Sequence, residues 1–253
     1  MLTPDDTEQS RKFVERFEER FSDKIKLLDD SLSLAAYRAV SPQAPFNLTA
    51  EESKRIGAAI GCDVFIMVRS YTQRRSAYRR PEYYESYAPI YVVSSRTGRL
   101  LYWKLLSFED IKPDKSLKML NEAAAPLAAE IADKIGPAIK AEIAEPLPRT
   151  IEEVPDVDSP AAKNFKAPIP FRRIKPEYTT QASLYDVTAT VEMTVDLDAT
   201  GSILRTEVTR WAGFGLDESV EKAVRAMNWR PAERDGKPLP MRFLLRYNFK
   251  KLL

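Results

Sequence analysis

The last third of the chain alternates apolar and polar positions in two separate stretches. In residues 187–197, and again in 242–249, the odd-numbered positions carry apolar or aromatic side chains. Successive side chains of a strand point to opposite faces of a sheet, so both stretches predict strands with one buried and one solvated face. Residues 203–211 predict the antiparallel partner of the first strand, after a turn at 198–201.

Between these strands the apolar spacing changes to that of a helix. The residues that fall on one helical stripe are Leu216, Val220, Ala223, Val224 and Met227. Asp217 and Glu218 stand in the first turn, where the helix dipole favours negative charge. We therefore expect a module of two strands, a helix and a last strand, in which the helix covers the apolar face of the sheet.

The first half of the chain mixes helical and strand patterns. Phe13, Phe17 and Phe21 recur four apart, and Thr49 with Glu52 forms a capping box. The patterns predict helices over 3–21, 30–40, 49–61 and 116–135, the last one interrupted by Gly136-Pro137, and strands over 25–28, 63–71, 89–95 and 100–106. This order predicts an α+β domain, an α/β sandwich with a small mixed sheet.

Prolines divide the chain into two parts. Six of them fall in residues 144–170, among acids and without apolar periodicity, which is typical of an extended, semi-rigid linker. We therefore predict an N-terminal α+β domain over 1–143, a linker over 144–170 and a C-terminal domain over 171–253. The fold class is α+β with two domains.

Composition removes most enzyme mechanisms. The chain has no histidine and one cysteine, Cys62, so catalysis by a histidine triad, histidine-ligated zinc and an intramolecular disulfide are all excluded. Only 8 glycines are present and none forms a phosphate-binding loop, and no metal-ligand spacing is visible. We expect a non-enzymatic protein without a cofactor, and we expect Cys62 to be a buried structural thiol.

Short motifs in the last third of the chain follow one another in the order of a known domain family. They are Pro176-Glu177-Tyr178, Asp196-Leu197-Asp198-Ala199-Thr200-Gly201, Val208, Gly213, Leu216-Asp217, Val220, Ala223-Val224, Trp229, Pro231-Ala232, Gly236-Lys237 and Phe249. Over residues 175–249 this series resembles the C-terminal domain of TonB-type energy transducers. The first half has a looser resemblance, through Ile56-Gly57 and Ile60-Gly61-Cys62-Asp63, to the TolB-N-terminal or CsgG-like envelope α/β domains.

The TonB resemblance implies a protein-binding module. Such domains capture an extended segment of an outer-membrane receptor by β-strand addition along their last strand, which gives affinity through the backbone. Carried over by position, the candidate contacts are Arg242, Leu244, Arg246, Tyr247 and Asn248. The plain structural alternative is that these residues only complete the sheet and keep its edge soluble.

A second candidate patch interleaves arginine and tyrosine in residues 74–87. Its members are Arg74, Arg75, Tyr78, Arg79, Arg80, Tyr83, Tyr84 and Tyr87. Such a segment can stack on single-stranded nucleic acid or contact a protein. The formal net charge of only +2 disfavours nucleic acid, so we expect a solvated hairpin loop or a protein contact.

The expected function is that of a cell-envelope adaptor, TonB-like and associated with transport, which binds an extended peptide of an outer-membrane or other envelope partner. The N-terminal domain would dock a second partner. The alternative is a structural subunit that forms a homodimer through the same strands. No apolar run is long enough to span a bilayer, and residues 1–6 lack the features of a signal peptide. We expect a periplasmic or envelope location if a leader or anchor was removed before Met1, and a cytoplasmic one otherwise.

Overall fold

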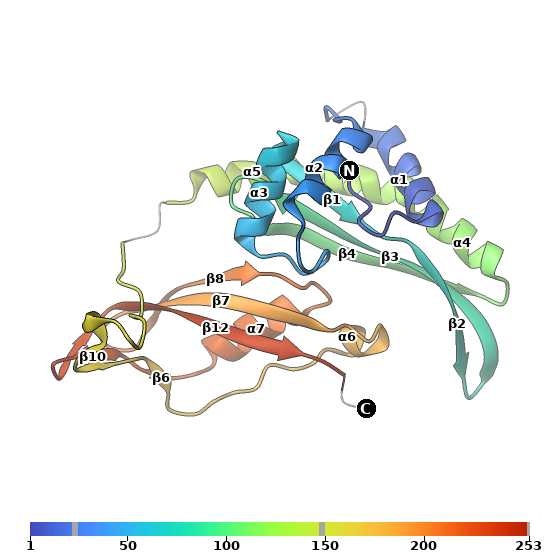
Figure 1. The fold of residues 1–253 in the computed structure, drawn as a ribbon. Coiled ribbons are helices and arrows are strands. Elements are labelled where there is room, and N and C mark those ends of the chain that lie inside the picture. Colours follow the sequence, from blue (N-terminus) through green and yellow to red (C-terminus); the bar gives the residue numbers. More distant parts are fainter. Residues whose placement is uncertain (22–24, 147–149, 252–253) are drawn as a thin grey trace. The chain divides into compact units, whose positions relative to one another are not determined.

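The chain divides into two compact units of helices and antiparallel sheets. The computed structural model describes residues 1–21, 25–146 and 150–251. Unit 1 comprises Met1–Phe46 and Ala50–Glu145, and unit 2 comprises Asn47–Thr49 and Pro146–Leu253. The fold class is α+β, as predicted (Figure 1).

Unit 1 packs helices against a four-stranded sheet. Its elements are α1 (Glu8–Phe21), α2 (Asp30–Val40), α3 (Ala50–Ile60), β1 (Val64–Val68), β2 (Tyr71–Ala77), β3 (Arg80–Ser94), β4 (Leu100–Asp110), α4 (Pro113–Glu122) and α5 (Ala124–Ala144). The long strand β3 pairs with β1 and β2 at its two ends and with β4 along its other side, always antiparallel. A parallel bridge from Leu2 to Met67 makes the sheet mixed.

The main core of unit 1 lies between helices α1, α4 and α5 and one face of the sheet. The phenylalanine stripe of α1 is fully buried, and the rings of Phe13 and Phe17 lie 5.7 Å from centre to centre. It packs with Leu120 and Ile131 against alternate residues of β1 and β3, such as Ile90. The spacing of four found in the sequence is therefore the buried face of a helix.

Several predictions for unit 1 differ from the structure. Strand β3 begins at Arg80 rather than Pro89, and the predicted strand 63–71 is divided between β1 and the start of β2. Helix α1 begins at Glu8 rather than near Thr3, because the Thr7 hydroxyl accepts the Ser10 N–H while Leu2 pairs with β1. Residues 25–28 form no strand; they pack Ile25 and Leu27 against the core. The helical stretch divides before Ala124 instead of ending at Gly136-Pro137.

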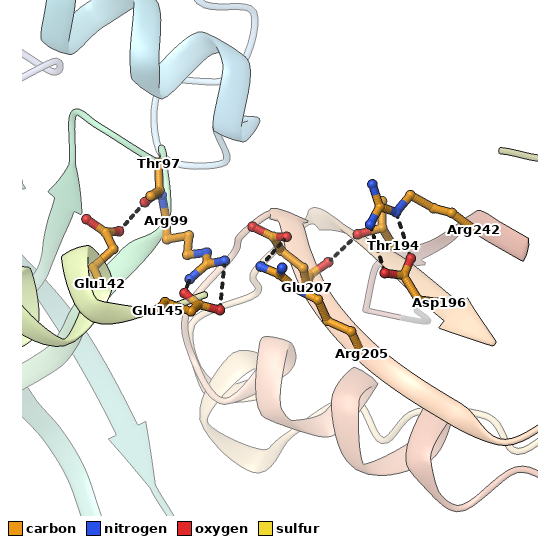
Figure 2. A network of polar contacts seen from close by, with 9 residues as sticks. All are labelled: Thr97, Arg99, Glu142, Glu145, Thr194, Asp196, Arg205, Glu207 and Arg242. Atoms are coloured by element: carbon orange, nitrogen blue, oxygen red, sulfur yellow. Dashed lines mark hydrogen bonds and ion pairs between the residues drawn. The ribbon is translucent and has the colours of Figure 1, made fainter. Parts of the chain in front are cut away.

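Helix α5 continues past Pro137 because its last turns are anchored to the β3–β4 turn. Buried Glu142 accepts hydrogen bonds from the hydroxyls of Ser94 and Thr97. Figure 2 shows the bond from Thr97 and the ion pair between Arg99 and Glu145. These charge-assisted bonds stabilise helix beyond the position where proline removes one backbone bond.

Unit 2 contains a three-stranded antiparallel sheet covered by one helix. Its elements are the 3-10 turn η1 (Pro160–Ala162), β5 (Phe165–Lys166), β6 (Ile169–Pro170), α6 (Thr180–Leu184), β7 (Ala189–Leu197), β8 (Ile203–Arg210), α7 (Leu216–Arg225), β9 (Trp229–Arg230), β10 (Ala232–Arg234), β11 (Lys237–Leu239) and β12 (Met241–Phe249). The strand order is β12-β7-β8. The predicted succession of strand, strand, helix and strand is present, and the apolar stripe of α7 is buried.

The proline-rich stretch 144–170 does not run free over its described residues. Strand β5 pairs with β10 and β6 pairs with β9, while Glu153 forms a parallel bridge with Arg242. The composition predicted an extended chain, and the chain is extended, but it adds short strands to unit 2.

The turn between β7 and β8 contains a glycine that no other residue can replace without strain. Gly201 has φ of +87°, and a Cβ built on it would lie 2.2 Å from the carbonyl oxygen of Trp229. Gly236, in the turn between β10 and β11, has φ of +75° with no atom within 4 Å of such a Cβ. A side chain at Gly236 would therefore meet backbone strain alone, whereas a side chain at Gly201 would meet both strain and a steric clash.

We expect Gly201→Ala to lower the free energy of unfolding by about 2–4 kcal/mol, because it adds a clash with backbone to the strain of positive φ. Gly236→Ala should cost only about 1 kcal/mol. Denaturant titration of both variants measures the difference. Equal losses in the two variants would show that the contact with Trp229 is not tight.

Candidate functional site

Strand β12 lies at an open edge of the sheet in unit 2. It pairs with β7 from Met241↔Leu197 to Phe249↔Ala189, and over the described residues it has no sheet neighbour on its other side except at Arg242. There the Arg242 N–H donates to the Glu152 carbonyl at 2.8 Å, and the Val154 N–H donates to the Arg242 carbonyl at 3.0 Å. The backbone groups of Arg242 thus point outward.

The outward direction repeats every second residue along the strand. The N–H and C=O groups of Leu244, Arg246 and Asn248 therefore face the same side as those of Arg242. Within residues 1–21, 25–146 and 150–251, no backbone partner is bonded to them on this edge. A stretch of about five residues is left as a template for another strand.

A groove of about 960 Å³ runs beside this edge, within unit 2. Its floor is β12, and its walls come from residues 153–157, 167–170 and 173–175. The apolar and aromatic residues among its lining are Val154, Val157, Ile169, Ile174, Met227, Trp229, Phe243, Leu244, Leu245 and Tyr247. Val157 is 90% exposed and Leu244 52% exposed, so apolar surface at this edge faces solvent.

The two predicted arginine contacts are held by acids of the neighbouring strand. Arg242 lies opposite Asp196, with its Nε 2.6 Å from a carboxylate oxygen (Figure 2). Arg246 lies opposite Glu192, with a guanidinium nitrogen 2.7 Å from a carboxylate oxygen. Asp196 is 4% and Glu192 7% exposed, so the predicted solvated face of β7 is wrong at these positions because arginine side chains cover the carboxylates.

The five predicted contacts divide between two faces of the edge. The side chains of Arg242, Leu244, Arg246 and Asn248 share the face that carries the acids of β7, whereas Tyr247 shares the face of the buried Val191. Asn248 accepts a hydrogen bond from the Thr190 hydroxyl at 2.8 Å. All five side chains lie along the open edge, but only Leu244 and Tyr247 offer apolar surface to the groove.

The groove walls were not predicted from the sequence. The sequence identified Trp229 only as a residue of the family motif. The centre of its ring lies 5.0 Å from the centre of the Phe243 ring at the groove floor. Val157 and Ile169 belong to the stretch predicted as a linker. The signal that could have found them is the presence of isolated apolar residues among prolines and acids.

Comparison with known protein families matches residues 174–251 to the Gram-negative bacterial TonB protein C-terminal domain. Unit 2 carries a TonB C-terminal-like domain. The predicted resemblance over 175–249 is confirmed.

Solved structures give weaker likenesses. The TonB C-terminal domain of Pseudomonas aeruginosa is 20% identical over 35% of this chain and 87% of its own, with a TM-score of 0.29. A hypothetical protein of Chlamydia trachomatis is 12% identical over 52% of this chain and 83% of its own, with a TM-score of 0.28. The search of curated proteins found no match. The TolB-like or CsgG-like resemblance of the first half stays a prediction.

Asp217 of the TonB-like domain closes the loop ahead of α7. Its two carboxylate oxygens accept the backbone N–H groups of Ala212 and Gly213 at 2.9 and 2.8 Å. Enclosure of the carboxylate raises the pKa of Asp217 to about 7, although the two hydrogen bonds act in the opposite direction. The predicted dipole role of this residue is therefore secondary to a local structural one.

The second candidate patch, outside the TonB-like domain, is a hairpin of two strands rather than a loop. Residues 74–77 lie in β2, and Arg80 and the residues that follow lie in β3. Arg75 pairs with buried Glu85 at 2.7 Å, and Arg80 pairs with Glu109 at 2.6 Å while its guanidinium covers the Tyr83 ring. These acids neutralise much of the charge that a nucleic acid would need.

Two features are absent from the described residues. No group of three acidic, cysteine or histidine side chains gathers there in a way that could hold a metal ion. No helix among them is long and apolar enough to cross a membrane.

Cys62 is half-buried, with Sγ 3.4 Å from the Ser95 hydroxyl, and burial raises the pKa of its thiol. A raised pKa keeps the thiol protonated, which fits a structural role.

The pKa of Asp217 predicts a stability effect with a definite sign. Because the folded-state pKa of about 7 exceeds the ordinary value of 3.8, the contribution of this group is fully present below pH 3.8 and is lost as the pH rises to about 7. The amide introduced by Asp217→Asn does not titrate, but its NH2 group cannot accept one of the two backbone N–H groups, so the pKa is reported by the pH dependence of the stability difference and not by its absolute size. We expect the variant to gain about 1–3 kcal/mol relative to the wild type between pH 4 and pH 7.

Urea unfolding at a series of pH values measures this difference. Glu218→Gln, at the exposed neighbouring acid, is the matched control and should show a much smaller change. A constant difference between Asp217→Asn and the wild type across this range would contradict the raised pKa.

Proposed function

We propose that the TonB-like domain binds an extended peptide of a partner protein, such as a segment of an outer-membrane receptor, by β-strand addition to β12. The observation that carries the proposal is the open stretch of outward backbone groups at Leu244, Arg246 and Asn248 beside an apolar groove. An added strand satisfies those groups and covers the exposed side chains at once. The protein acts as an adaptor, and no chemical step is required of it.

The expected affinity is moderate. Each new backbone hydrogen bond contributes about 0.5–1.5 kcal/mol net, and each apolar side chain that is fully buried adds about 1.5–3 kcal/mol. Association and ordering of a flexible peptide cost several kcal/mol. A peptide that spans the open stretch and inserts one or two apolar side chains should therefore bind with a Kd in the micromolar range.

Selectivity comes from the groove rather than from the predicted arginine side chains. Arg242 and Arg246 form ion pairs with Asp196 and Glu192. Removing either arginine would leave a buried carboxylate without its partner. Alternate side chains of an added strand point into the groove, where Ile169, Phe243 and Tyr247 are available to pack with them. We therefore expect the partner peptide to carry apolar residues at every second position.

Leu244→Pro tests the proposal at the backbone. It removes one outward N–H while leaving the bonds to β7 intact, and proline is tolerated on an edge strand in this orientation. We expect the full-length variant to lose peptide binding by at least about tenfold, measured by calorimetry with peptides from the N-termini of candidate outer-membrane receptors. Leu244→Ala, which keeps the N–H, should lose no more than about threefold.

The same two variants also test the alternative, in which β12 forms a homodimer. If Leu244→Pro abolishes a concentration-dependent dimer and no peptide binds the wild type, the edge serves self-association, and peptide capture is wrong. Equal peptide affinity in Leu244→Pro and Leu244→Ala would show that β12 is not the docking strand. Circular dichroism of both variants checks that the fold is kept.

A further inference from the structure

The segment Ile151–Val157 is bound to one end of the edge that the partner peptide is proposed to use. Glu153 bridges Arg242 in parallel orientation through the two backbone hydrogen bonds described above. The Glu152 side chain pairs with the guanidinium of Arg234, with Nη1 3.0 Å from a carboxylate oxygen. We call residues 151–157 the strap.

The strap leaves the edge after a single bridge. Pro155 follows the last bonded residue, Val154, and a turn closed by the Ser159 N–H on the Asp156 carbonyl carries the chain away. Val157 is almost fully exposed and forms a groove wall. With two backbone bonds and an exposed ion pair, this segment belongs to the least stable part of the unit and opens readily.

We infer that the strap is an internal ligand of the β12 edge, which competes with the partner peptide for the Arg242 end of the groove. The inference rests on the proposed function and adds its regulation. While the strap is bound, an incoming strand finds only the stretch from Leu244 to Asn248. When the strap detaches, the whole outward face of β12 is open.

The strap also indicates the chemistry of the external ligand. It presents two acids, Glu152 and Glu153, followed by the β-branched Val154, and it runs parallel to β12. The groups around it are basic, since Arg234 bonds Glu152, and Arg173 and Lys175 line the groove. An extended peptide with acids ahead of a β-branched apolar residue fits the same position with the same polarity.

Val154→Pro releases the strap without touching β12. It removes the N–H that donates to the Arg242 carbonyl, and its position in an extended segment accepts proline. The probe is a synthetic peptide of residues 150–158, added to the full-length wild type and to the variant. A tethered strap has an effective concentration in the millimolar range, so its release should raise the affinity for the free peptide by at least about threefold.

Amide hydrogen exchange at Arg242 reports strap binding independently of any peptide. The N–H of Arg242 is bonded to Glu152 in the wild type, so we expect its exchange to become at least about tenfold faster in Val154→Pro. The Leu244 amide, on the same edge without a backbone partner among the described residues, should exchange fast in both proteins.

A second pair of variants separates the strap from general charge effects. Glu152→Ala removes the anchor to Arg234 and should act in the direction of Val154→Pro, whereas Asp158→Ala removes an exposed acid within the turn Asp156–Ser159 and should change nothing. Faster exchange at Arg242 with no gain in peptide affinity would show that the strap does not compete with the peptide. Unchanged exchange at Arg242 in Val154→Pro would show that the strap is not bound to β12.

The same measurements distinguish a failure of the proposed function from a failure of this inference. If the 150–158 peptide binds Val154→Pro more tightly than the wild type while no receptor-derived peptide binds either protein, the strap is an internal ligand of a site with another natural partner. If receptor-derived peptides bind both proteins equally and the 150–158 peptide binds neither, the proposed function stands and the inference is wrong.

Discussion

Two carboxylates on the central strand β7 hold the edge strand β12 in register. Glu192 faces Arg246 on one side and Arg210 on the other, and Asp196 faces Arg242. A slip of one residue would place these arginines on the apolar face under α7 and leave the acids uncompensated. The register therefore decides which backbone groups of β12 point outward, and with that the position of the open stretch and of the strap.

In this arrangement the side chains and the backbone of β12 have different roles, although the sequence predicted one binding role for the whole strand. The arginines of β12 stabilise the sheet through their side chains, while the backbone of the same strand stays available for binding. Selectivity then depends on the groove, whose walls come from residues far from β12 in sequence, such as Val157 and Ile169. A partner is then recognised by shape and apolar spacing along β12, and by the basic groups around the strap at the Arg242 end.

Periodic segments were predictable from the sequence because their pattern directly reflects burial. The apolar positions of β7, the stripe of α7 and the phenylalanines of α1 are all buried where the pattern indicates, although β7 begins at Ala189 rather than Val187. The open edge at β12 was predicted through family resemblance, and its residues lie along that edge, although their role in binding stays a prediction.

What the sequence did not reveal depends on contacts between distant residues. Burial of Glu192 and Asp196 requires arginines from two neighbouring strands, and no local pattern specifies that register. Likewise, a proline-rich acidic stretch has the composition of a linker whether it is free or bound, because its pairing with Arg242 depends on an edge formed much later in the chain. The continuation of α5 past Pro137 depends in the same way on Ser94 and Thr97.

The most direct test of the central claim is amide hydrogen exchange along β12 in the full-length protein, measured with and without a saturating receptor-derived peptide. Strand addition predicts an alternating result, in which the amides of Leu244, Arg246 and Asn248 become protected while those of Phe243, Leu245 and Tyr247, which face β7, do not change. Peptide binding with no alternation along β12, or with protection confined to another strand, would contradict the account.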